Sequence, residues 1–260
     1  MTNLTAHTIV RNEEQWIWYA IQSVLEYVEQ IIIFDTGSTD DTIKIIKSIH
    51  SPKIKLLEKG TVTPERLVAL RNEQLQMTKT DWFLLLDGDE VWPEPTIKEL
   101  VRVIPETQNH LSAIAVKAMV PVGDLFHYQS ESAGRYEILG RRGHFNIRGY
   151  RIKEGYKWEG IYPLEAYADT NHIPVQKKND ELVLLKNAYW HLTHLVRSSR
   201  RRDQKYKYEI GKKINDKLPE VFFKTRQAIV PSPWISFSGY ERIKAIFLTP
   251  LREIKRKLEL

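Results

Sequence analysis

The stretch WFLLLDGDE, residues 82–90, decides how the rest of the chain folds. Five apolar residues in a row are typical of a strand buried on both faces of a parallel sheet. Asp87 and Asp89 follow with only Gly88 between them, and α/β enzymes bind ligands at the carboxyl ends of such strands. Two hard oxygen ligands suit Mg²⁺ or Mn²⁺ held with substrate phosphates, and Gly88 would let a ligand approach the backbone. An ordinary turn after a strand is the competing interpretation.

Length and composition restrict the classes of protein to consider. The 260 residues suffice for one large domain with appendages, and the absence of cysteine excludes disulfides, thiolate metal sites and cysteine nucleophiles. The sequence contains neither the roughly eighteen apolar residues in a row of a membrane-spanning helix nor a signal-peptide pattern at residues 1–10. We therefore expect a cytoplasmic protein, at most peripheral on the cytoplasmic face of a membrane. A net charge of +6 favours anionic partners: nucleic acid, anionic lipid or phosphorylated substrates.

The first hundred residues alternate between strand patterns and helix patterns. Strands are expected at 4–10, 30–34, 53–57 and 82–86, and helices at 16–28 and 64–77. This alternation predicts parallel βαβ units with right-handed crossovers. The polar loop DTGSTDD, residues 35–41, follows the second strand and leads into a helix. Its donors suit an anion and Asp35 could accept hydrogen bonds from a ribose or a base, although a well-capped turn explains the same residues.

Four pieces of the sequence, taken together, resemble family 2 glycosyltransferases of the GT-A fold. They are VRNE at 10–13, FDTGSTDDT at 34–42, RN at 71–72 and LLLDGDE at 84–90. The resemblance covers about residues 4–104. It implies an α/β, Rossmann-like fold with a mixed, mainly parallel sheet flanked by helices. It also implies a nucleotide-sugar donor, a UDP- or GDP-sugar, with Mn²⁺ or Mg²⁺ as cofactor.

The resemblance also assigns roles to single residues on the donor side. It implies that Asp87-Gly88-Asp89 binds the metal and the diphosphate. The nucleoside pocket would be lined by Val10, Asn12, Glu13 and Asp35. Arg71 is expected either beside the diphosphate or in a structural salt bridge.

A late strand pattern, NAYWHLTH at 187–194, resembles the strand that delivers the family's third metal ligand. Imidazole is a suitable ligand to complete a carboxylate site. His191 and His194 are both candidates, and His191 is preferred because it directly follows the apolar Tyr-Trp pair.

The acceptor side of the resemblance rests on residues 150–165. In the family a strand with an arginine, here Tyr150-Arg151-Ile152, precedes an aromatic-x-Gly sequence, here Trp158-x-Gly160, and then a His-Glu pair. Glu165 takes the place of that glutamate, whereas Leu164 replaces the histidine. A positioned carboxylate can accept the proton of an acceptor hydroxyl, so Glu165 is the expected catalytic base, with Glu159 as the alternative and Asp89 and Glu90 as more remote ones. If the acceptor is itself a phosphate, no base is needed.

The C-terminal third differs in character from the rest. We expect a GT-A catalytic domain at 1–195, with a nucleotide-binding half at 1–104 and an acceptor half at 105–195. A basic helical segment at 196–230 would clamp the donor diphosphate or be a solvated charged helix. The last part, 231–260, is predicted to form amphipathic helices, kinked or divided at Pro250. Their apolar face carries Ile243, Ile246, Phe247, Leu251, Ile254 and Leu258.

The basic residues around the other face of residues 231–260 favour attachment to an anionic membrane surface. Docking on the protein's own core or in a dimer is the alternative. The sequence thus predicts a metal-dependent inverting glycosyltransferase with a lipid-linked acceptor, a polyprenyl-phosphate or a lipid-bound glycan, at the cytoplasmic membrane face. A soluble saccharide or a protein is the alternative acceptor. A nucleotidyltransferase would need a glycine-rich loop after the first strand, and a nucleic-acid-binding protein would leave Asp87 and Asp89 unexplained; no nucleic acid partner is expected.

Overall fold

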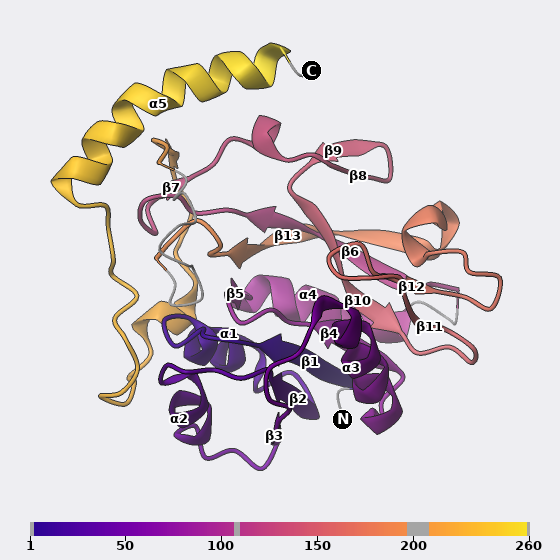
Figure 1. Cartoon of the computed structure of the whole chain (residues 1–260). Coiled ribbons are helices and arrows are strands. Elements are labelled where there is room, and N and C mark those ends of the chain that lie inside the picture. Colours follow the sequence, from indigo (N-terminus) through magenta and orange to yellow (C-terminus); the bar gives the residue numbers. More distant parts are fainter. Residues whose placement is uncertain (1–2, 107–109, 197–207, 259–260) are drawn as a thin grey trace.

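The computed structural model describes residues 3–106, 110–196 and 208–258. The large sheet contains β1 (Leu4–Val10), β2 (Gln30–Asp35), β3 (Ile54–Glu58), β4 (Trp82–Leu85), β5 (Glu90–Val91), β6 (Ala113–Met119), β10 (Phe145–Arg151) and β13 (Leu182–His191). Their order is β3-β2-β1-β4-β10-β6-β13-β5 (Figure 1). Strands β3, β2, β1 and β4 are parallel, as are β6 and β13, whereas β10 and β5 run antiparallel to their neighbours. The predicted mixed, mainly parallel sheet is confirmed.

Five α-helices accompany the sheet in the described part of the chain. They are α1 (Ile17–Val24), α2 (Thr42–Lys47), α3 (Pro64–Met77), α4 (Glu94–Glu106) and α5 (Gly239–Leu258). The structure confirms the strands and helices expected in the first hundred residues, with end shifts of a few residues at most places and a shorter α1. None of the helices in the described ranges has the length and apolar character that a membrane crossing requires.

Strand β4 is buried on both faces of the sheet, as its sequence predicts. Trp82 and Leu84 pack into the core that contains α1 and α4, and Phe83 and Leu85 pack into the opposite core, where α3 lies. The alternation follows from the two-residue period of a strand, so burial on both sides requires apolar residues throughout. This double burial fixes the position at which the chain leaves the sheet, at Asp87.

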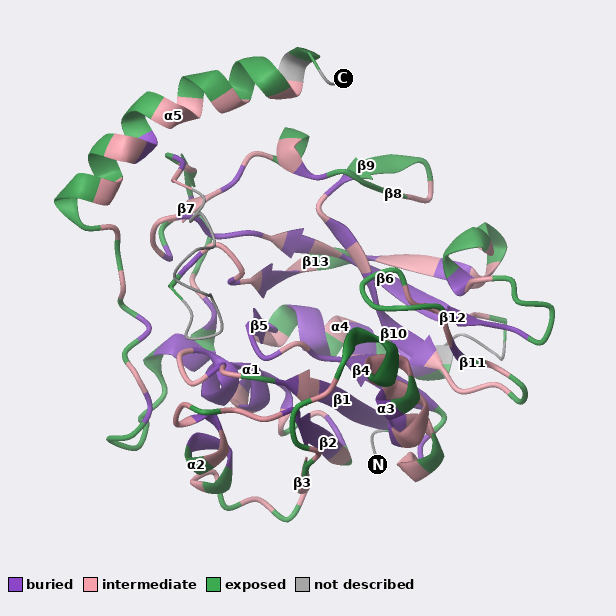
Figure 2. Cartoon of the chain, in the orientation of Figure 1, coloured by how far each residue is buried: buried purple, intermediate pink, exposed green. Residues whose placement is uncertain are grey.

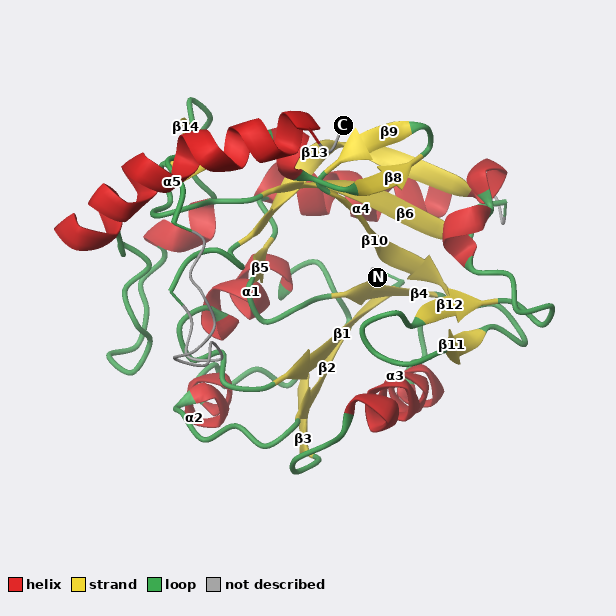
Figure 3. Cartoon of the chain, turned by 45° about the horizontal axis from the view of Figure 1, so that its top comes forward, coloured by secondary structure: helices red, strands yellow, loops and turns green. Residues whose placement is uncertain are grey.

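Six short strands pair outside the large sheet. They are β7 (His127–Tyr128), β8 (Tyr136–Ile138), β9 (Arg141–Gly143), β11 (Lys157–Glu159), β12 (Ala166–Ala168) and β14 (Lys212–Lys213). Strand β11 pairs with β12, β14 with β7 and β8 with β9. The β8–β9 hairpin projects on the same side of the sheet as α5, as two views of the molecule show (Figures 1 and 3).

The basic segment differs from the helix expected at 196–230. Residues 197–207, which hold most of its arginines, lie outside the described residues. Residues 208–230 contain β14 and a 3-10 turn, Glu220–Phe223, but no α-helix. Pro219 and Gly211 interrupt any helical run there. The proposed boundaries near residues 195 and 230 stay a prediction.

Helix α5 is one continuous helix rather than two, although it contains Pro250. Its inward face is polar: Arg256 makes two hydrogen bonds to the buried carboxylate of Glu209, at 2.6 and 2.7 Å, and Thr249 Oγ1 accepts one from the backbone N–H of Ile210. Six of the larger apolar residues of the helix are exposed, namely Ile243, Ile246, Phe247, Leu251, Ile254 and Leu258, whereas the small Ala245 is buried (Figure 2). The helix is therefore tied to the body through its polar face, and its apolar face is turned outward.

Candidate active site

The carboxyl end of β4 carries a buried cluster of charges. Arg148, on β10, lies between the two carboxylates that flank the turn: its Nη2 donates to Asp87 Oδ2 at 3.0 Å and also to Glu90 Oε1. The Arg148 side chain is 9% exposed and that of Glu90 is fully buried, whereas that of Asp87 is 38% exposed. Asp87 therefore faces the open side of the cluster, and Glu90 lies beneath it.

A bulge in β10 brings Arg148 to this position. The pairing of β10 with β6 shifts register between Ile147 and Gly149, at the point where Arg148 stands. An extra residue in one strand turns its side chain away from the regular alternation, a device common next to active sites. The guanidinium that reaches the carboxylates is thus that of Arg148, which was not predicted from the sequence; Arg151 as the family's strand arginine stays a prediction.

Burial controls the protonation of Glu90. Desolvation raises the pKa of Glu90 to about 7, although the positive charge of Arg148 opposes the shift. The pKa of Arg148 stays well above its ordinary value because Glu90 and Asp87 outweigh the effect of its own burial. Glu90 is thus a buried carboxyl group whose charge depends on Arg148.

Asp89 and His191 lie together on the other side of the turn. His191 Nε2 is 3.5 Å from Asp89 Oδ2, and the pairing of β13 with β5 sets His191 opposite Glu90. Burial lowers the pKa of His191, but the neighbouring Asp89 carboxylate outweighs this and raises it above the ordinary value. His194 instead lines the wall shared by two cavities. Of the two histidines considered, His191 is the one beside Asp89.

The carboxylate–imidazole pair fits a divalent cation. Two ligands at adjacent corners of an octahedral Mg²⁺ site lie about 3 Å apart, close to the spacing of Asp89 Oδ2 and His191 Nε2. Asp87, the third expected ligand, is bonded to Arg148 instead, and no group of three His, Cys, Asp or Glu side chains suited to a metal occurs within the described ranges. A cation bound here would need oxygens of a diphosphate or water to complete its coordination.

Glu165 and Arg71 form a buried pair across the site. Arg71 Nε donates to Glu165 Oε1 at 3.1 Å, and the side chains are 11% and 8% exposed. The Arg71 guanidinium also lies over the Trp158 ring, 5.1 Å from its centre. The salt bridge is one of the two roles that the sequence left open for Arg71. The second carboxylate oxygen, Oε2 of Glu165, is buried and has no hydrogen-bond partner among the described residues.

One cavity of about 490 Å³ collects these groups. Its lining includes Asp87, Arg148, Glu165, Arg71 and His191. The alternative base, Glu159, does not line it and is paired with His172 and Lys157. Asp87 and His191, the cations of Arg71 and Arg148, and the Glu165 carboxylate therefore line one cavity. The cations could bind a diphosphate, and Glu165 Oε2 could accept a proton.

The donor-side loop is held by its own side chains. Asp35 Oδ1 accepts hydrogen bonds from the backbone N–H groups of Gly37 and Ser38, both at 3.0 Å. Asn12, whose φ is 55°, accepts one from the backbone N–H of Thr39 at 2.7 Å. Asn12 and Asp35 lie at the carboxyl ends of β1 and β2, as expected. Their hydrogen bonds hold the turn that follows β2 in place.

Gly88 makes a close approach, but to the protein itself. A Cβ atom at this position would lie 3.0 Å from Glu13 Cγ and 3.2 Å from Val10 Cγ2. The glycine therefore allows the loop after β1 to pack against the turn after β4. This packing brings Val10, Glu13 and the Asp87–Asp89 turn together and gives Gly88 a structural role. The expectation that Gly88 also admits a ligand to the backbone stays a prediction.

Comparison with known proteins decides the family. The model of the family described as Glycosyl transferase family 2 matches residues 5–161, more than half of the chain. The chain belongs to glycosyltransferase family 2. The four sequence pieces predict this family.

Relatives and solved structures agree with this assignment. An uncharacterized glycosyltransferase of Rickettsia typhi, RT0209, is 27% identical over 121 residues, which are 46% of this chain and 39% of that protein. A TPR repeat-containing protein of Synechococcus elongatus is 33% identical over 90 residues, 35% of this chain and 21% of that protein. The chain thus spans about two fifths or less of the length of these two curated relatives.

The crystal structure of S. aureus TarS 1–349 has a TM-score of 0.51 with 17% identity, and the match covers 73% of this chain and 60% of that one. In complex with UDP-GlcNAc, TarS gives a TM-score of 0.53 with 16% identity, covering 78% and 60%. This likeness confirms the GT-A fold.

The buried ion pair of the site was not predicted from the sequence. Arg148 and Glu90 form the buried ion pair beneath Asp87, yet only Glu90 was considered, and only as a remote alternative base. The available signal was an arginine within FNIRGYR, an otherwise strand-like pattern with little room for a charge. A charge in a buried strand is a reason to look for a carboxylate partner.

Proposed function

We propose that this chain is an inverting glycosyltransferase that uses a UDP- or GDP-sugar and a divalent cation, Mn²⁺ or Mg²⁺. The observation that carries the proposal is the single cavity lined by Asp87, Arg148, His191, Arg71 and Glu165. UDP-sugars deserve the first test, because the structurally similar TarS has been crystallised with UDP-GlcNAc.

Asp89 and His191 would hold the cation, and Asp87 would face the same diphosphate from the open side of the turn. The cation would offset the negative charge that develops on the leaving diphosphate. Arg148 would add positive charge beneath Asp87 without being exposed to solvent. Val10, Asn12, Glu13 and Asp35 would line the nucleoside pocket beyond the turn.

Glu165 would act as the base. Its Oε1 is fixed by Arg71, which leaves the buried Oε2 directed at no protein group in the described part of the chain. Oε2 would take the proton of an acceptor hydroxyl while the hydroxyl oxygen bonds to the anomeric carbon of the donor sugar. The bond from that carbon to the diphosphate breaks on the opposite face, so the anomeric configuration inverts.

The acceptor is proposed to be lipid-linked, with α5 resting on the cytoplasmic membrane face. The support is the orientation of α5, whose polar side is tied to Glu209 while Phe247, Leu251 and Leu258 are 72%, 63% and 83% exposed. An amphipathic helix with an exposed apolar face and basic neighbours suits the interface of an anionic bilayer. A soluble saccharide or a protein would be the acceptor if α5 binds no membrane.

Hydrolysis of nucleotide-sugar donors tests the catalytic part of the proposal. We expect slow, metal-dependent release of the nucleoside diphosphate, which drops about 100-fold in Asp89→Asn because a charge near the leaving group is lost. Asp180→Asn, at an exposed site that does not line the active-site cavity, is the matched control and should keep full activity. Equal rates with EDTA and with Mn²⁺ would contradict the proposed role of the metal.

A further inference from the structure

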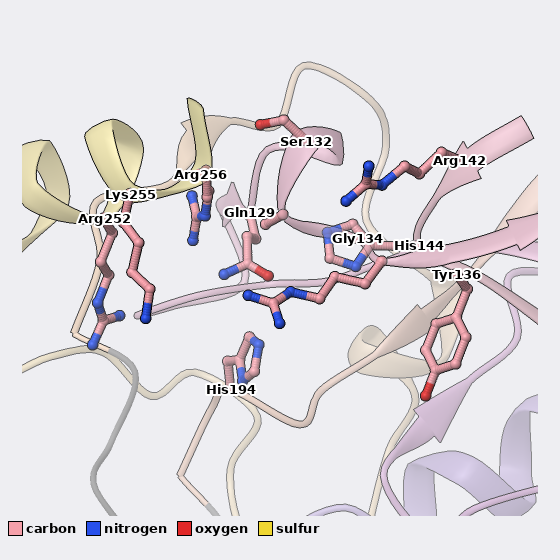
Figure 4. Close-up of a pocket in the computed structure, with 12 residues that line it drawn as sticks. Gln129, Ser132, Gly134, Tyr136, Arg142, His144, His194, Arg252, Lys255 and Arg256 are labelled. Atoms are coloured by element: carbon pink, nitrogen blue, oxygen red, sulfur yellow. The ribbon is translucent and has the colours of Figure 1, made fainter. Parts of the chain in front are cut away.

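A second cavity, also of about 490 Å³, lies between α5, the β8–β9 hairpin and the end of β13 (Figure 4). Its lining is strongly basic and includes two histidines. The charged and titratable side chains that line it are Arg135, Arg142, His144, His194, Arg252, Lys255 and Arg256. No Asp or Glu belongs to the lining, as far as the described ranges extend. The carboxylate of Glu209, which does not line the cavity, is buried and bonded to Arg256. The charged side chains that line the cavity are therefore cationic.

One of these cations is incompletely paired. Arg252 Nη1 is buried, has no hydrogen-bond partner among the described residues and lies 3.9 Å from Glu209 Oε2. A buried guanidinium N–H without an acceptor costs free energy, and an anion in the cavity would supply that acceptor. Figure 4 shows Arg252, Lys255 and Arg256 extending from α5 toward His194, with Arg142 approaching from the opposite side. The arrangement suits a phosphate or diphosphate, which accepts several such hydrogen bonds.

The same helix separates charge from apolar surface. The side chains of Arg252 and Arg256 are on the cavity side, whereas Phe247, Leu251 and Ile254 are 72%, 63% and 56% exposed on the outer side. A ligand with an anionic group and a long apolar chain would match both sides of this helix at once. An isoprenoid lipid that ends in a phosphate or diphosphate has this chemistry.

The basic cavity adjoins the active-site cavity. Tyr136, His144 and His194 line both. A group bound among the cations of α5 is therefore next to the space that holds Glu165 and Asp87, but is not in it. The phosphate would be anchored outside the reaction centre, and a sugar attached to it would reach inward.

We propose that the basic cavity binds the phosphate or diphosphate of a lipid-linked saccharide acceptor, whose sugar hydroxyl reaches Glu165. The proposal rests on the proposed glycosyltransferase reaction. It distinguishes the two lipid-linked acceptors: a hydroxyl of a lipid-bound glycan, and not the phosphate oxygen of a polyprenyl-phosphate, attacks the donor. Glu165 is required as a base in this case.

The test is calorimetric titration of the full chain with farnesyl diphosphate, in EDTA so that the diphosphate is not captured by a metal at Asp89. Farnesyl diphosphate should bind, inorganic diphosphate more weakly, and farnesol not measurably. Arg142→Gln and Arg252→Gln, on opposite walls of the cavity, should each weaken the binding of farnesyl diphosphate about tenfold. Arg102→Gln, at an exposed arginine of α4 that lines neither of the two cavities, should leave it unchanged.

UDP binding with Mn²⁺ is measured on the same variants, with thermal melting as the check that each is folded. Unchanged UDP binding beside weakened farnesyl diphosphate binding supports the proposal. Unchanged affinity for farnesyl diphosphate in both variants overturns it. Equal affinities for inorganic and farnesyl diphosphate overturn the lipid source of the anion, and loss of UDP binding makes the cavity part of the donor site. A protein that binds farnesyl diphosphate through Arg142 but no UDP would refute the proposed reaction and leave the anion site standing.

Discussion

The charges at the end of β4 and the charges beneath α5 are satisfied in different ways. At β4, Arg148 Nη2 donates to both Asp87 and Glu90, so this cation is closely paired within the protein, although its Nε has no hydrogen-bond partner among the described residues. Beneath α5, five arginines and lysines line one cavity, and Arg252 Nη1 has no acceptor among the described residues and lies 3.9 Å from Glu209. A closely paired buried cation stabilises the fold, whereas a cation without a close carboxylate is suited to an anionic ligand. Changes at the first should therefore lower stability, and changes at the second should lower binding.

The largest effect is expected when the ion pair between Arg148 and Glu90 is broken. Arg148→Leu leaves Glu90 buried without its partner, and we expect a loss of about 3–5 kcal/mol in the free energy of unfolding at pH 8. Arg252→Leu is the matched change beneath α5 and should cost less than about 1 kcal/mol, because its partner contact is long. Urea denaturation of both variants measures the difference. Equal losses would contradict the distinction between the two regions.

The pH dependence of stability sharpens the same point. The pKa of Glu90 is raised by burial to about 7, so the folded protein holds a proton there that the unfolded chain releases near pH 4.5. This contribution is complete below about pH 4.5 and is lost as the pH rises through 7. Relative to Glu90→Gln, wild-type protein should lose up to roughly 3 kcal/mol across that interval. Parallel stability curves for the two proteins would show that Glu90 titrates normally.

Removal of the base should affect activity and leave the fold almost unchanged. Glu165→Gln keeps an oxygen for Arg71 but cannot accept a proton, so we expect transfer to a hydroxyl acceptor to fall about 100-fold or more. Donor binding, measured as the affinity for UDP with Mn²⁺, should stay within about twofold. Glu159→Gln is the control and should transfer at the wild-type rate. The opposite result for the two glutamates would assign the base to Glu159.

The smallest effect on stability is expected at the outer face of α5. Because Phe247 and Leu251 are exposed, changing both to Ser should alter the free energy of unfolding by about 0.5 kcal/mol or less. Binding to vesicles of phosphatidylglycerol should weaken about tenfold or more, since both side chains would be buried in the bilayer interface. Flotation with vesicles measures it, and Phe223→Ser, at an exposed phenylalanine outside α5, is the control. A large loss of stability would mean that this face packs on protein.

The sequence was sufficient for the parts of the fold that depend on local pattern. Residues 82–86 had to be a strand buried on both faces, and the alternation before them predicted the parallel sheet. The resemblance to the family implied that a histidine at the end of a late strand joins Asp89, and His191 Nε2 lies 3.5 Å from Asp89 Oδ2.

Other parts depend on contacts between distant segments, which a local pattern does not contain. The position of Arg148 depends on a shift in the register of β10 against β6, which the pattern of residues 145–151 does not show. The periodicity of α5 gives the residues that share a face but not the face that turns inward. That choice depends on Glu209, which lies outside the helix and binds Arg256.

The most direct test of the central claim is a thermal-shift measurement with UDP and GDP, each with Mn²⁺, Mg²⁺ or EDTA. A family 2 glycosyltransferase with a metal held by Asp89 and His191 should be stabilised by one nucleotide in a concentration-dependent way, and EDTA or Asp89→Asn should abolish the shift. Absence of any shift with either nucleotide and either metal, repeated in the presence of anionic liposomes, would contradict the claim.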